Sequence, residues 1–259
     1  MKYILSLLLT TAIFFGLKAE SPLIQQADSA YTADNFKEAA DTYLHVIATE
    51  GNSAALQYNL GNCYYRLGEM GKAILAYERA LRLDPTFDDA KTNLEFVNAR
   101  IADRPGERGT FLGNATDAVA NSAKSNTWAW LGFACFVLTI AGGLAYAFSG
   151  TVIVRKIGFF GGFVTLIASG CFIYLAFRSA AIATADNVAI ITSPSTILST
   201  SPRVPKDRTQ EAMLLHEGTR VEILDSVHST TDSVKSLWYD VQVDNTHRAW
   251  INAAAVEKI

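Results

Sequence analysis

The residues best suited to metal binding or nucleophilic chemistry are three cysteines and four histidines. They are Cys63, Cys135, Cys171, His45, His216, His228 and His247. No two histidines stand at the spacing of a metal-ligand pair, and no Cys-x-x-Cys pattern occurs. Three cysteines, two of them inside long uncharged runs, also argue against a disulfide-stapled scaffold. We therefore predict no metal site and no bound cofactor.

Catalysis by the chain alone would need a nucleophile beside a base, or a pair of carboxylates. No serine-centred or paired-carboxylate motif stands out in the sequence. The 22 basic and 25 acidic residues give a net charge of −3, which provides no basic surface for nucleic acid. We predict no catalytic residue, a protein that is not an enzyme, and no nucleic-acid partner.

A period of 34 residues organises the N-terminal part of the chain, aligning Ala27 with Gly61 and Tyr43 with Tyr77. Small residues allow two antiparallel helices to approach closely, and aromatic rings fill the space between them. The run over residues 54–87 resembles a tetratricopeptide repeat. The matching positions are Leu60, Gly61, Tyr64, Ala73, Tyr77, Ala80 and Pro85. A degenerate repeat precedes this run and a capping helix follows it, so we predict an all-α tetratricopeptide repeat solenoid over residues 20–102.

This resemblance implies an adaptor module in which the first helix of each pair lines a concave peptide-binding groove. The residues that it places in the groove are Tyr58, Asn59, Asn62, Tyr65, Arg66 and Asn93. Asparagine and arginine side chains there suit a peptide backbone or a carboxylate. Two and a half repeats are marginal for independent stability, so we expect a partner or a self-contact to complete the stack.

Two uncharged segments, residues 128–148 and 157–177, each have the length of a transmembrane helix. They contain eight and eleven Leu, Ile, Val or Phe residues, each favouring insertion by about 0.3 to 0.6 kcal/mol. The short connection between them carries Arg155 and Lys156, and positive loops stay in the cytoplasm. We predict a two-pass membrane protein with a region of two transmembrane helices over residues 127–178 and both soluble domains outside the cytoplasm.

Residues 1–19 have the charged start and apolar core of a signal peptide, although an uncleaved anchor stays open. Residues 103–126 are rich in small and polar side chains and are predicted to be a linker. Small residues four apart, Gly143 with Ala147 and Gly158 with Gly162, favour close helix packing. These small residues suit helix packing within one hairpin and helix packing between two chains equally well. A homo-oligomer is therefore one of the two alternatives.

Short alternating runs after Arg178 predict strands, with prolines and glycines between them. The order of these runs over residues 186–259 resembles the bacterial SH3-like domain, an all-β small barrel. Trp238 and Trp250 are either packed in its strands or lie on its surface as a platform for peptide or glycan.

The whole order of signal, repeats, hairpin and barrel is similar to BatE-type aerotolerance proteins. That resemblance implies a scaffold in the bacterial inner membrane with both soluble domains in the periplasm. It also implies partner membrane proteins with von Willebrand-type domains, linked to a MoxR-type ATPase, in envelope stress tolerance. The competing hypothesis is an accessory protein that acts on or binds the cell wall, because barrels of this kind often accompany such domains.

Overall fold

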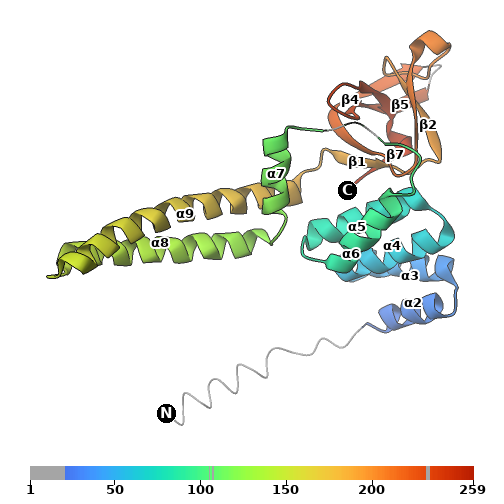
Figure 1. The fold of residues 1–259 in the computed structure, drawn as a ribbon. Helices are drawn as coiled ribbons and strands as arrows, with labels where there is room; N and C mark the ends of the chain where they lie inside the picture. The colour runs from blue at the N-terminus through green and yellow to red at the C-terminus, as the bar shows by residue number, and fades with distance from the viewer. Residues whose placement is uncertain (1–20, 105, 107, 232–233) are drawn as a thin grey trace.

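The computed structural model describes residues 21–104, 106, 108–231 and 234–259 (Figure 1). The predicted signal peptide, residues 1–19, lies outside the described residues. As the sequence predicted, the chain is a multidomain protein of three parts: a helical repeat module, two long apolar helices, and an antiparallel β module.

The helical module contains five helices in two antiparallel pairs and a final single helix. They are α2 (Pro22–Thr32), α3 (Phe36–Thr49), α4 (Ala54–Leu67), α5 (Met70–Leu83) and α6 (Asp88–Asn98). Helix α4 starts where the Ser53 side chain accepts a hydrogen bond from the Leu56 N–H, and it ends at Gly68, whose φ of 80° is left-handed. Helices α4 and α5 touch so closely that a Cβ on Gly61 would lie 2.6 Å from the Tyr77 ring. The repeat period therefore reflects a steric requirement.

The two long helices, α8 (Ser125–Phe148) and α9 (Val152–Thr184), form an antiparallel hairpin that extends away from the other two modules (Figure 1). Both are long and apolar enough to cross a membrane, and only 6% of the most apolar window of either helix is buried. Such exposure does not suit the core helices of a water-soluble domain.

Glycines allow the backbones of α8 and α9 to come into contact near the turn of the hairpin. A Cβ on Gly142 would lie 2.7 Å from the Gly158 carbonyl oxygen, and a Cβ on Gly158 would lie 2.6 Å from the Gly142 oxygen. Nothing lies within 4 Å of the same position on Gly143, so the contact falls on the residue before the one that the sequence suggested. Packing within one hairpin thus uses the Gly158 and Gly162 pair. The segment expected as a linker contains a further helix, α7 (Phe111–Ala120).

The β module is one seven-stranded antiparallel sheet in the order β3-β2-β6-β5-β4-β1-β7. The strands are β1 (Val188–Ile191), β2 (Ser195–Ser199), β3 (Glu211–His216), β4 (Arg220–Thr231), β5 (Val234–Gln242), β6 (Arg248–Asn252) and β7 (Val256–Lys258). Two 3₁₀ turns, η1 (Arg208–Gln210) and η2 (Ala253–Ala255), precede β3 and β7. All seven strands contribute buried side chains to one core, so the sheet curls around it.

The helical and β modules share a hydrophobic cluster, which we call the junction. Ile190 of β1 is fully buried among Ile74, Leu94 and Val97 of the helical module instead of in the core of its own sheet. Strand β1 thus packs against α5 and α6, the last helices of the repeat module, and this contact lies within the chain.

Candidate protein-binding groove

A pocket of about 180 Å³ opens between the first helices of the repeats. It is lined by Tyr31, Asn62, Tyr65, Tyr77, Thr92, Asn93, Phe96 and Val97, from α2, α4, α5 and α6. The helices that tetratricopeptide modules use for ligands therefore supply most of its wall. The structure brings together three of the residues predicted for the groove, Asn62, Tyr65 and Asn93.

The pocket has a hydrogen-bonded polar floor. Tyr77 donates its hydroxyl to Asn62 Oδ1 at 2.7 Å, and Asn93 Nδ2 donates to the same oxygen at 3.0 Å. Asn93 Nδ2 also lies 3.4 Å from the Tyr58 hydroxyl. Burial raises the pKa of Tyr77 well above its ordinary value, so the phenol stays a hydrogen-bond donor. These bonds fix the Asn62 and Asn93 amides before any ligand arrives.

One arginine lies over an aromatic ring of the pocket. The Arg100 guanidinium stands 3.3 Å from the centre of the Phe96 ring, and Phe96 lines the pocket. Tyr65 meets Phe96 edge to face, with ring centres 5.8 Å apart. The rim therefore combines positive charge with aromatic surface, which suits an extended peptide that carries a carboxylate.

The other predicted groove residues, Tyr58, Asn59 and Arg66, do not line the pocket, although Tyr58 contacts Asn93. Asn59 is half-buried on α4 and does not line the pocket, and Arg66 reaches toward Phe36 instead. Tyr31 and Phe96 do line it, although the sequence prediction omitted both. Tyr31 precedes Tyr65 by the same 34 residues that relate Asn59 to Asn93, so the repeat period could have identified it.

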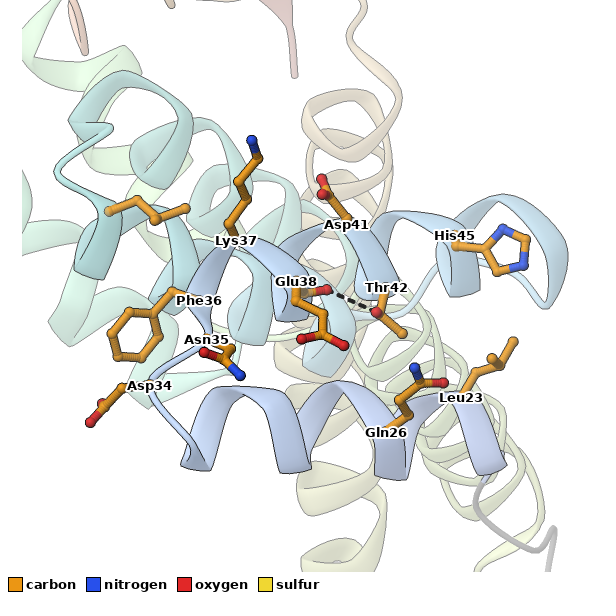
Figure 2. Close-up of a pocket in the computed structure, with 11 residues that line it drawn as sticks. Leu23, Gln26, Asp34, Asn35, Phe36, Lys37, Glu38, Asp41, Thr42 and His45 are labelled. Carbon is orange, nitrogen blue, oxygen red and sulfur yellow. Dashed lines mark hydrogen bonds between the residues drawn. The ribbon is translucent and has the colours of Figure 1, made fainter.

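A larger hollow of about 850 Å³ lies beside α2 and α3 (Figure 2). The side chains of Leu23 and Gln26 point from α2 toward α3 (Figure 2). The exposed side chain of Lys37 points away from α2. The Thr42 hydroxyl donates to the Glu38 carbonyl within α3. Among the described residues, no group of three or more His, Cys, Asp or Glu side chains could hold a metal ion. The hollow is a broad surface depression, and the described residues that line it form no candidate metal site.

The two tryptophans proposed for the barrel surface differ in exposure. Trp238 is only 2% exposed and donates its ring N–H to Ser236 Oγ at 2.8 Å. Of the two alternatives for Trp238, the ring therefore packs inside the β module, and the hypothesis of a surface platform is wrong for this residue. Trp250 of β6 is half-buried.

Polar contacts at the junction were not foreseen from the sequence. Asp103 accepts hydrogen bonds from the His216 N–H at 2.5 Å and from the Thr219 hydroxyl at 2.7 Å, and contacts the His216 ring at 2.8 Å. Burial alone would raise the pKa of Asp103, but these hydrogen bonds outweigh burial and hold that pKa below the ordinary value. Glu217 accepts the Gly71 N–H at 2.9 Å, which caps the start of α5 from the β module.

Two arginines of α5 also form polar contacts at the junction. Arg79 donates to the Lys258 carbonyl at 2.5 Å and pairs with Glu257 at 2.8 Å. Arg82 donates to the Ala183 carbonyl of α9 at 2.7 Å and to the Ile259 carbonyl. Helix α5 thus contacts the β module and the end of the hairpin at once.

Comparison with known proteins identifies the repeat. Residues 54–87 match the tetratricopeptide repeat family, which covers α4 and α5. A segment of 87 residues is 31% identical to the CTR9 homolog of Arabidopsis thaliana. That segment is 33% of this chain and 8% of the Arabidopsis protein, so the chain spans a small part of that relative. The chain therefore contains a tetratricopeptide repeat, a module typical of protein–protein interaction.

Proposed function

We propose that this chain is a non-catalytic scaffold of the bacterial inner membrane that holds two binding modules in the periplasm. The helical module supplies the groove for a protein partner. The β module, as a bacterial SH3-like domain, braces the helical module and presents a second surface. The similarity to BatE-type proteins supports a role in envelope stress tolerance.

The antiparallel hairpin is the observation that carries this proposal. Both soluble modules lie at the open end of α8 and α9, while the turn lies at the far end (Figure 1). A hairpin that crosses the bilayer therefore holds both modules on one side. Arg155 and Lys156, in the first turns of α9, favour the cytoplasm for the closed end.

The groove favours a partner with an acidic or carboxylate-bearing extended segment, because Arg100 lies over the ring of Phe96, which lines the pocket. Membrane proteins with von Willebrand-type domains, linked to a MoxR-type ATPase, are the partners that the BatE resemblance implies. Such partners would meet the groove in the plane of the membrane.

Cysteine accessibility tests the proposed topology. Single cysteines at Ser149 in the hairpin turn and at Asn245 in the β module would be placed in a chain without its native cysteines. A membrane-impermeant maleimide should label the Asn245 site in right-side-out vesicles and the Ser149 site in inverted ones. Labelling of both sites from the same side would contradict the spanning hairpin. Labelling of Asn245 in inverted vesicles only would reverse the proposed orientation.

Site-specific photocrosslinking tests the groove. A photoreactive residue at Tyr65 should crosslink to a co-expressed von Willebrand-type membrane protein, and Arg100→Glu should weaken that yield. The same photoreactive residue at Leu44, exposed on α3, is the matched control and should give little product. Equal yields from both positions would contradict a groove-specific contact. Binding of purified peptidoglycan by the chain, with no crosslink to the membrane partner, would favour the cell-wall alternative.

A further inference from the structure

Helix α7 is attached to the hairpin. It lies across α9 near the end closest to the β module (Figure 1). Asp117 of α7 accepts two hydrogen bonds from the Arg178 guanidinium, at 2.5 and 2.9 Å. The Trp128 ring N–H donates to the Ala120 carbonyl at 3.0 Å, which holds the last turn of α7 against the start of α8. These contacts fix α7 relative to α8 and α9.

An apolar groove of about 560 Å³ runs between α7 and α9. Leu112, Ala115 and Val119 line it from α7, and Ile167, Cys171 and Tyr174 line it from α9. Thr116, which also lines the groove, donates its hydroxyl to the Gly113 carbonyl of its own helix. A peptide backbone in this groove would lose its hydrogen bonds with water and find few replacements, whereas a hydrocarbon chain needs none.

The position of the groove along α9 points to its occupant. Its α9 residues lie inside the uncharged run over residues 157–177, and Arg178 marks the polar end of that run. Helix α7 exposes two large apolar side chains, Phe111 (85% exposed) and Leu112 (73%), and Leu112 also lines the groove. Asp117, the one charged residue of α7, is paired. Helix α7 therefore presents an apolar face at the depth where the spanning segment would meet lipid.

We propose that α7 is an interfacial membrane helix and that an acyl chain of a bilayer phospholipid fills the groove between α7 and α9. The lipid comes from the leaflet on the side of the two modules. The inference rests on the proposed membrane anchoring and extends it, because residues 111–120 become part of the membrane domain. The helical and β modules are thereby held against the bilayer surface.

Fluorescence quenching in lipid vesicles tests this proposal on the full chain. The native cysteines would be replaced, and one bimane-labelled cysteine introduced at Val119, at Asn121 or at Phe163. Asn121 lies two residues, about 200° of helix rotation, from Val119 and so faces away from the groove. Phe163, 58% exposed in the middle of α9, reports on the hairpin itself. The vesicles are phosphatidylcholine and phosphatidylglycerol with a nitroxide either on the acyl chain or on the headgroup.

Acyl-chain nitroxide should quench the Val119 label several-fold more than the Asn121 label, and more than headgroup nitroxide does. Quenching at Phe163 without quenching at Val119 would overturn the lipid groove and leave the anchoring intact. The absence of quenching at Phe163 would instead overturn the anchoring. An oxidative crosslink between Val119→Cys of two chains, without lipid quenching, would assign the groove to a second copy and also overturn the proposal.

Discussion

Asp103 shows how one carboxylate can couple two modules. It receives hydrogen bonds from His216 and Thr219 across the junction, and they lower its pKa. A carboxylate whose pKa is lower in the folded state stabilises the fold above the ordinary value of about 4. That contribution is lost as the pH falls through the folded-state pKa.

Asp103→Asn should therefore lower the free energy of unfolding at neutral pH by about 1 to 3 kcal/mol, because it leaves buried donors poorly matched. The difference between wild type and variant should shrink as the pH falls below about 4. Urea unfolding of the detergent-solubilised chain at several pH values would measure it. Asp41→Asn, at an exposed position on α3, is the control and should change stability by less than about 0.5 kcal/mol. A difference that is independent of pH would contradict the role of the carboxylate charge.

Cys63 provides a second test at the residue scale. Burial raises its pKa to about 12, so the thiol is neutral at physiological pH, and neutral thiols react slowly. In a chain with Cys135→Ala and Cys171→Ala, a maleimide at mildly alkaline pH should label Cys63 only after urea unfolds the repeats. Rapid labelling of the native chain, followed by mass spectrometry, would contradict this burial.

At the scale of elements, the two hairpin helices depend on glycine contacts in which backbone meets backbone. Gly142→Leu should force α8 and α9 apart, because its first side-chain atom would lie 2.7 Å from the Gly158 oxygen. Gly143→Leu is a matched control, since nothing lies within 4 Å of that position.

The readout is a disulfide between Thr139→Cys and Thr165→Cys in a chain without the native cysteines, because the two threonine hydroxyl oxygens lie 2.9 Å apart. The crosslink should form in the Gly143→Leu chain and be reduced several-fold in the Gly142→Leu chain. Equal yields would show that the helices do not use this contact.

Patterns along the chain predict elements well when the cause is local. The repeat predicted that small residues allow close helix approach with aromatic rings between the helices, and in the structure Gly61 lies against the Tyr77 ring. The choice between Gly142 and Gly143 could not be predicted, because a helix that is apolar on all sides gives no sign of its rotation. The repeat pattern predicted that Asn62, Tyr65 and Asn93 lie in the groove. The sequence could not predict that Ile190 packs in the junction. A buried isoleucine on a short strand looks the same whether it packs on its own sheet or on another module.

For the whole molecule, the junction means that the helical and β modules share stability. Ile190→Ala, a change in the β module, should destabilise the helical module by about 2 to 5 kcal/mol through the cavity that it leaves. Hydrogen exchange of the α5 and α6 amides should accelerate accordingly. Ile197→Ala, at a residue of β2 that is 45% exposed, is the control and should leave α5 and α6 unchanged. Faster exchange confined to the β module would show that the modules fold independently.

The arginines of α5 also have a consequence for association between chains. A strand at the border of a sheet normally displays unpaired carbonyls that invite a foreign strand, which is a common route to aggregation. Here Arg79 occupies the carbonyl of Lys258 in β7, the border strand, and Arg82 occupies that of Ile259, the residue after it. Strand exchange or fibril growth from the β module would therefore have to begin at β3, the opposite border.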